Sequence, residues 1–316
     1  MGLPAEKLRT RPLLSVHRAA TRFDPTRTIF LRQSFVRDFT RRFRALKNEI
    51  IRAVVVEDCF GLTPPDAGIR RIMVQEVTLT TPGHGAFAFP RSAEKVTAFM
   101  KWLQEQEQAG LLEVSHRPQL GQAVESAWTD RYISDSYQRG VQRARYELAH
   151  TGYSVPSIES TGGVLASMSL PFHVDRVGLL FTRTFSGLKG ITDAMDHQIS
   201  QVLAQAMADG DGARVIAKIL VATIDGNNAG TLGITDTLGR FIPAERRAEM
   251  LARTEVIRAY AESSLQEYKN WGVEGVSAEV EFKNAGDARV CPECASLEGR
   301  VYTLEEASGI IPVHTF

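Results

Sequence analysis

The chain has 316 residues, of which 43% are hydrophobic and 23% charged, and its 37 basic residues balance its 37 acidic ones. This composition is typical of a folded globular protein and argues against a protein that binds nucleic acid through its overall charge. Three cysteines exclude a disulfide framework and favour a reducing compartment, and no stretch has the apolar length of a signal peptide or a membrane span.

The first 52 residues differ from the rest in charge, because they hold thirteen Lys and Arg residues against four acids. Within them, residues 28–56 predict a helix, since Phe35, Phe39 and Phe43 begin an apolar stripe with steps of three and four. A solvated surface and a surface that binds an anion, DNA or a partner are equal alternatives for the other faces. Those faces carry Arg32, Arg37, Arg41, Arg42, Arg44 and Lys47.

Further elements follow up to a candidate domain boundary. Residues 69–90 predict an extended segment, and Ser92 is expected to cap a helix that Gly110 ends. A helix is expected over 122–152, with Trp128, Tyr132, Val141, Ala144 and Leu148 pointing inward. Residues 151–171 are rich in Gly and Ser and predict a hinge. The expected domains are residues 1–120, a basic helix with a small α/β region, and residues 121–316.

The second half of the chain is predicted to be mainly helical. A helix over 172–210 is expected to break near Gly187 and Gly190, and a short helix is expected at about 213–224. Pro243 predicts the start of a helix that ends at Gly272. Strand patterns return at "VSAEVEF" (276–282) and "GRVYTL" (299–304). The predicted class is mostly α with small β elements (α+β), a helical body with a C-terminal hairpin that carries a Cys-x-x-Cys.

Cys291 and Cys294 are the most specific candidates for a chemical site. Two thiolates at this spacing, in a turn between strands, can bind one zinc ion, and His314 would be a third ligand. The fourth ligand is missing, so a pair of reduced, half-buried thiols remains the alternative. A redox site is disfavoured, because it belongs at the N-terminus of a helix after a βαβ strand.

The other candidate constellations are weaker. Arg253, Glu255, Arg258 and Glu262 have the spacing of ion pairs on one helix, and pairing is favoured over a catalytic Glu. The histidines form no metal-binding motif, and the loops at 187–192 and 225–236 lack residues that a phosphate or calcium loop requires. Residue patterns alone therefore indicate a helical protein with a cysteine knuckle and no catalytic constellation.

Three stretches carry a family resemblance, "ARTEVIRAYAESSLQEYKNWGV" (252–273), "DARVCPECASLEGRVYTL" (287–304) and "IPVH" (311–314), with a weaker one at "YISDSYQRGVQRARYEL" (132–148). They resemble the phage head-morphogenesis family, the minor head proteins similar to phage Mu protein F. Members show an Arg-Thr-Glu helix, then a D-x-R-V-C-P-x-C-x-x-L-x-G hairpin, then Pro-x-His and a Cys-x-Cys pair.

The resemblance implies a structural role rather than an enzyme. It places Cys291, Cys294 and His314 in a terminal knuckle whose remaining cysteines would follow Phe316, so zinc is expected only if such ligands exist. It implies a minor head protein of a tailed phage, at the portal vertex or in the head interior, that acts in head assembly and genome packaging or delivery. The implied partners are the portal protein, other head or scaffold proteins and packaged DNA, without a membrane.

The same resemblance implies a location in the virion head, and in the host cytoplasm during assembly. Two alternatives remain open. One is a DNA-binding structural protein of the virion interior that uses the helix at 28–56. The other is an enzyme of the toxin or effector type that carries the same domain.

Overall fold

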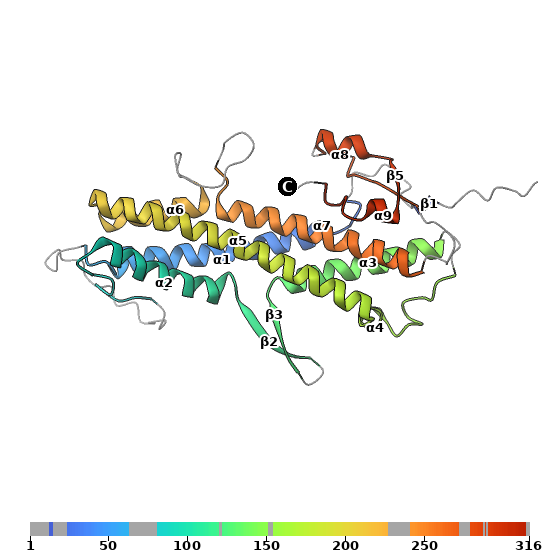
Figure 1. The fold of residues 1–316 in the computed structure, drawn as a ribbon, viewed down its shortest axis with the longest axis horizontal. Helices are drawn as coiled ribbons and strands as arrows, with labels where there is room; N and C mark the ends of the chain where they lie inside the picture. Colours follow the sequence, from blue (N-terminus) through green and yellow to red (C-terminus); the bar gives the residue numbers. More distant parts are fainter. Residues whose placement is uncertain are drawn as a thin grey trace, which may run out of the picture. The chain divides into compact units, whose positions relative to one another are not determined.

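The computed structural model describes residues 13–14, 24–62, 81–119, 122–150, 154–226, 241–271, 279–286, 288 and 290–313. Long helices make up most of the described chain, with small β elements, as the sequence predicted (Figure 1). The chain divides into two compact units, each built from separate stretches. Unit 1 contains residues 1–33, 130–182 and 253–316, and unit 2 contains residues 34–129 and 183–252. No helix among the described residues has the length and hydropathy needed to cross a membrane.

Helix α1 (Ile29–Ile51) continues directly into a π-helical turn, η1 (Arg52–Val56), so the predicted helix at 28–56 is confirmed. Its expected apolar stripe is buried in unit 2. Phe35 and Phe39 stack with their ring centroids 4.9 Å apart, and Trp128 meets both rings edge-on. The indole of Trp128 donates a hydrogen bond to the carbonyl oxygen of Leu111 at 2.8 Å, which satisfies its buried N–H.

Unit 2 also contains a hairpin that the sequence analysis missed. Helix α2 (Ser92–Gly110) ends at Gly110 as predicted, but Ser92 is its first helical residue and not its cap, because the N-cap position is taken by Arg91. Strands β2 (Val114–Gln119) and β3 (Gln122–Ala127) follow and pair antiparallel. The prediction of a helix from residue 122 is therefore wrong for its first turns. The segment "QAVESA" has no apolar repeat at steps of three or four, and it gains backbone hydrogen bonds from β2 instead.

Helix α3 (Asp130–His150) begins with an acidic residue in its first turn, which is favourable beside the N-terminal end of the helix dipole. The four of its residues predicted to point inward, Tyr132, Val141, Ala144 and Leu148, are all buried. In unit 1 it packs closely against α7 (Ala244–Trp271) at Gly140, where a Cβ would lie 2.4 Å from the carbonyl oxygen of Tyr260. Only glycine allows this approach, and the hydroxyl of Ser264 then donates to the Gly140 carbonyl oxygen at 3.2 Å.

Helix α5 (Pro171–Asp209) follows the short helix α4 (Val164–Met168) and is continuous, so the predicted break near Gly187 and Gly190 is wrong. Gly187 instead allows close packing within unit 2. A Cβ on Gly187 would lie 2.9 Å from Cδ1 of Leu251, whereas one on Gly190 would meet nothing within 4 Å. Gly187 thus makes room for a packed leucine without ending the helix, because hydrogen bonds on either side continue the helix through it.

The remaining predictions for the second half are confirmed. Helix α6 spans Ala213–Asp225, and α7 begins directly after Pro243 and ends before Gly272. Near the C-terminus, β4 (Glu279–Glu281) pairs antiparallel with β5 (Val301–Thr303) and parallel with β1 (Leu13–Leu14), which gives the strand order β1-β4-β5. Two short helices, α8 (Pro292–Leu297) and α9 (Leu304–Ala307), flank β5.

Two expectations fall on parts of the chain that lie outside the described residues. The first is most of the extended segment predicted at 69–90, of which only residues 81–90 are described, and these form turns and bends. The second is the loop at 227–240. The expected domains at 1–120 and 121–316, with a hinge at 151–171, remain a prediction.

Candidate functional site

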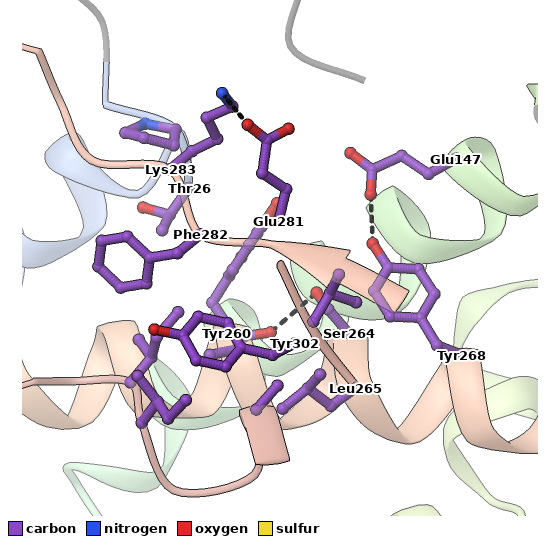
Figure 2. A pocket seen from close by; sticks show the side chains of 16 residues that line it. Thr26, Glu147, Tyr260, Ser264, Leu265, Tyr268, Glu281, Phe282, Lys283 and Tyr302 are labelled. Carbon is purple, nitrogen blue, oxygen red and sulfur yellow. Dashed lines mark hydrogen bonds and ion pairs between the residues drawn. The ribbon is translucent and has the colours of Figure 1, made fainter. Parts of the chain in front are cut away.

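A pocket in unit 1 is formed where α7 meets the C-terminal strands. Its walls come from α3, α7, β4, β5, the end of α9 and the turn before α1 (Figure 2). Four aromatic residues line it, namely Tyr260 and Tyr268 from α7, Phe282 next to β4, and Tyr302 from β5. Aliphatic side chains such as Leu265 complete a mainly apolar surface. The pocket therefore gathers segments that are more than 200 residues apart in the sequence.

One wall of the pocket holds a carboxylate that is fully engaged within the protein. The hydroxyl of Tyr268 donates a hydrogen bond to Oε2 of Glu147 (Figure 2). Nε of Arg143 lies 2.6 Å from the other carboxylate oxygen, Oε1. Burial, and then the negative charge of Glu147, raises the pKa of Tyr268 well above its usual value. Burial likewise raises the pKa of Tyr260. Both tyrosines are therefore neutral phenols across the physiological pH range.

A second, partly exposed ion pair lines the pocket beside β4. Nζ of Lys283 lies 2.5 Å from Oε1 of Glu281 and 3.6 Å from Oε1 of Glu298. The hydrogen bond to Glu281 raises the pKa of Lys283, so its ammonium group stays charged. Each charged residue that lines the pocket thus has an oppositely charged partner within the chain.

A buried polar relay in unit 1 joins α3, α5 and α7. The hydroxyl of Tyr137 lies 2.8 Å from Nδ1 of His173, whose Nε2 lies 2.7 Å from Oε1 of Glu267. Nε of Arg145 donates to the other oxygen of Glu267 at 2.7 Å, and its Nη1 donates to the carbonyl oxygen of Pro156 at 2.9 Å. None of these four side chains is more than 4% exposed. A Tyr-His-Glu series could suggest nucleophilic chemistry, but burial keeps substrate away, and the relay instead connects helices.

The two cysteines lie in the same turn, between β4 and β5. Cys291 is the N-cap of α8, and its Sγ accepts a hydrogen bond from the backbone N–H of Cys294 at 3.3 Å. The expected turn between strands is thus the start of a six-residue helix, because Pro292 is favoured at a first helical position. A helix therefore does follow Cys291, which the sequence analysis did not expect when it disfavoured a redox site. Burial, followed by the hydrogen bond with Cys291, raises the pKa of Cys294 to about 11.

A metal at this turn stays a prediction. His314 lies outside the described residues, and those residues contain no group of three or more His, Cys, Asp or Glu side chains that could hold a metal ion. The raised pKa of Cys294 means that a metal would have to displace a proton from this thiol at neutral pH, since zinc binds the thiolate.

The six basic residues predicted on α1 do not form one continuous face. Arg32 pairs with Asp24 at 2.6 Å, and Nζ of Lys47 lies 3.1 Å from Oε2 of Glu245 and 3.6 Å from Oδ2 of Asp225. Arg42 lies over the Trp128 ring, 4.2 Å from its centroid, and bonds to Glu113 at 2.8 Å. These three therefore serve internal packing.

Three of the six basic side chains remain exposed. Arg37, Arg41 and Arg44 are spaced at four and three residues along α1, so they share one side of the helix. Arg41 also pairs with Asp38 at 2.8 Å, a contact between neighbouring helical turns. Any surface on α1 that binds an anion or a partner would thus use three of the six predicted basic residues, Arg37, Arg41 and Arg44.

The predicted ion pairs on α7 are found in part. Glu255 is buried and lies 3.4 Å from Arg258, as the spacing suggested. Glu262 meets Arg176 of α5, at 3.6 Å, which the local pattern could not indicate.

Comparison with known proteins identifies the part of the chain that contains most of this site. Residues 197–313 match the family model of Phage Mu protein F like proteins. The match confirms the resemblance seen in the helix at 252–273 and in the cysteine hairpin. We refer to residues 197–313 as the Mu F-like segment. No curated protein and no solved structure gives a significant match.

The Mu F-like segment supplies the α7 and C-terminal walls of the pocket, both cysteines, and Glu267 of the relay. Sequence reasoning missed the pocket, because its residues follow no common spacing. One feature of the sequence could have indicated the relay. Arg145 lies on the inward face of α3, beside Ala144 and Leu148. A charged residue on such a face requires a buried partner.

Proposed function

We propose that this chain is a minor head protein of a tailed phage that acts structurally, at the portal vertex or in the head interior, in head assembly and genome packaging or delivery. The observation that carries the proposal is the match of residues 197–313 to the Phage Mu protein F like family. Its expected location is the virion head, and the host cytoplasm during assembly. Its expected partners are the portal protein and other head or scaffold proteins.

The engagement of the polar groups supports a structural rather than an enzymatic role. The side chains that most resemble catalytic groups, His173 and Glu267 of the relay, are fully buried. Glu255 is buried and lies at ion-pair distance from Arg258 of the same helix, 3.4 Å from its Nε. Such groups stabilise helix packing, since a buried charge is tolerated only when it is paired within the protein.

The proposal is tested by complementation in the phage that encodes the chain. The gene is deleted, an affinity-tagged copy is supplied in trans, and purified heads are analysed by mass spectrometry and electron microscopy. We expect the tagged chain in purified heads, recovery of portal protein with it from infected cells, and a loss of filled heads without it. Heads that assemble and fill normally without the chain, and never contain it, would refute the proposal.

A second candidate function, DNA binding inside the head, is favoured by one observation. Arg37, Arg41 and Arg44 are exposed on one side of α1. Contacts with phosphates through such side chains are independent of sequence and weaken with salt. Retention of unrelated duplexes with equal affinity, falling steeply as salt rises, would support this role, and salt-independent retention would exclude it.

A further inference from the structure

The size of the pocket in unit 1 limits what it can accept. Its volume is about 160 Å³. Pockets that bury small molecules of drug or cofactor size usually have volumes of roughly 300–1,000 Å³. The enclosed space is therefore that of one large side chain, and most of a nucleotide or a dinucleotide cofactor would lie outside it.

The chemistry of the lining selects a neutral group. Among the described residues, the charged ones of the lining are Glu147, Glu281 and Lys283, and each already has a partner of opposite charge. A charged ligand would lose its hydration in the pocket without gaining an oppositely charged partner there, and this loss of hydration is unfavourable for binding. By contrast, the phenol oxygens of Tyr260 and Tyr302 have no hydrogen-bond partner among the described residues and can meet one polar atom of a ligand.

A sheet edge lies next to the pocket. β5 is an outer strand of the sheet β1-β4-β5, and among the described residues it pairs only with β4. Its side chains alternate, with Val301 and Thr303 exposed while Tyr302 contributes to the pocket. An outer strand can accept an extended peptide through backbone hydrogen bonds, and adjacent pockets then select alternate side chains.

We propose that this pocket is a socket for one neutral, apolar side chain, leucine-like or aromatic, of a protein partner whose extended segment lies along β5. Such a knob in a preformed pocket is the usual form of a binding hot spot. The inference deepens the proposed function and rests on it only for the identity of the partner, a head protein. The chemistry of the socket can be tested without that partner.

The probes are N-acetylated amides of leucine, tyrosine, lysine and glutamate, titrated against the whole chain and followed by NMR. We expect the leucine and tyrosine probes to bind weakly and to shift resonances of pocket residues. The lysine and glutamate probes should bind at least about tenfold more weakly, because their charges gain no partner. Equal binding of all four probes, or no binding up to the solubility limit, would overturn the proposal.

The matched variants are Ala261→Leu and Lys269→Leu, both on α7. Ala261 lines the pocket, whereas Lys269 is exposed elsewhere on the helix. The first variant fills the socket, so its melting temperature should not fall, while its affinity for the apolar probes should fall at least about tenfold. The second should bind the probes as the unchanged chain does. Undiminished binding by Ala261→Leu would overturn the proposal, as would a loss of probe binding in both variants.

Tyr302→Phe provides a check that does not depend on filling the pocket. It removes one phenol oxygen and should weaken binding of the tyrosine probe more than binding of the leucine probe. Equal effects on both probes would contradict the assigned role of this hydroxyl. In the complementation assay, Ala261→Leu should enter fewer heads than Lys269→Leu. If the unchanged chain never enters heads, the proposed function fails, whereas equal incorporation of the two variants refutes only the socket.

Discussion

Glu107 on α2 is a buried ionisable side chain that forms no salt bridge with any described residue, and it makes a strong prediction about pH. It is 2% exposed and is hydrogen-bonded to Asp196 of α5, whose Oδ2 also accepts a hydrogen bond from Nε2 of Gln104 at 3.0 Å. Burial, and then the charge of Asp196, raises the pKa of Glu107 to about 10. Burial also raises the pKa of Asp196. The two carboxyl groups therefore share a proton in the folded protein at neutral pH.

The size of the effect follows from proton linkage. In the unfolded chain Glu107 titrates near its ordinary pKa of 4.5, so between there and about 10 the folded state binds one proton more. A group whose pKa is raised by folding favours the folded state most at low pH, and this advantage is lost as the pH rises. The contribution of Glu107 to the free energy of unfolding should fall as the pH rises, by about 3 kcal/mol between pH 6 and pH 8.

The assay is urea denaturation followed by circular dichroism between pH 5 and pH 9. Glu107→Gln keeps a hydrogen-bond donor toward Asp196 but has no titrating proton. Unfolding of the variant should therefore release about one proton fewer, so its free energy of unfolding should fall less steeply as the pH rises. The variant should therefore gain stability relative to the unchanged chain as the pH rises. Glu105→Gln, at an exposed position on the same helix, is the control and should leave the slope unchanged. If Glu107→Gln and the unchanged chain lose stability in parallel, the shared proton does not exist.

Three further predictions concern packing, charge and metal. Gly140→Ala should lower the free energy of unfolding by about 2 kcal/mol or more, because the added Cβ would clash with the Tyr260 carbonyl. Gly190→Ala should raise it by about 0.5–1 kcal/mol, because a Cβ there meets nothing within 4 Å. Equal melting temperatures of the two variants would contradict this prediction. Arg37→Glu, Arg41→Glu and Arg44→Glu combined should leave the circular dichroism spectrum intact while reducing head incorporation or DNA retention, and unfolding would instead show internal pairing. Zinc affinity, measured by competition with a chelator, should rise with pH and vanish in Cys291→Ser with Cys294→Ser, because the Cys294 thiol, with a pKa of about 11, must lose its proton; a pH-independent affinity would argue against thiolate ligands.

Long elements with a regular apolar spacing could be predicted from the sequence. The phenylalanine stripe of α1 and the inward face of α3 were found because burial of one helix face imposes a period on the residues. The errors arose where a local pattern has two physical readings. Gly187 was taken as a helix break, yet its function is to make space for Leu251. The strand β3 was taken as helix, because pairing with β2 is a contact that its own residues do not reveal.

The candidate site was less predictable than the fold for the same reason. Cys291 and Cys294 are neighbours in sequence, so their proximity was readable, although the helical turn that carries them was not. The pocket brings together residues from α3, α7, β4 and β5, whose spacing in the chain is irregular. Charge on a helix was a poor guide to accessibility, since Arg42 lies over Trp128 while Arg44 is exposed, although the two are only two residues apart.

The division of the chain has a consequence for biosynthesis. All of unit 2 has left the ribosome once residue 252 has emerged, because it consists of residues 34–129 and 183–252. Unit 1 still lacks its last stretch at that moment, and with it Glu267, the carboxylate between His173 and Arg145. Until that residue is made, Arg145 and His173 lack the carboxylate to which both are hydrogen-bonded in the folded protein. A chain that stops after residue 252 therefore contains all of unit 2 but not the socket, and the surface proposed for the partner is absent until the residues up to Ile311 have been made.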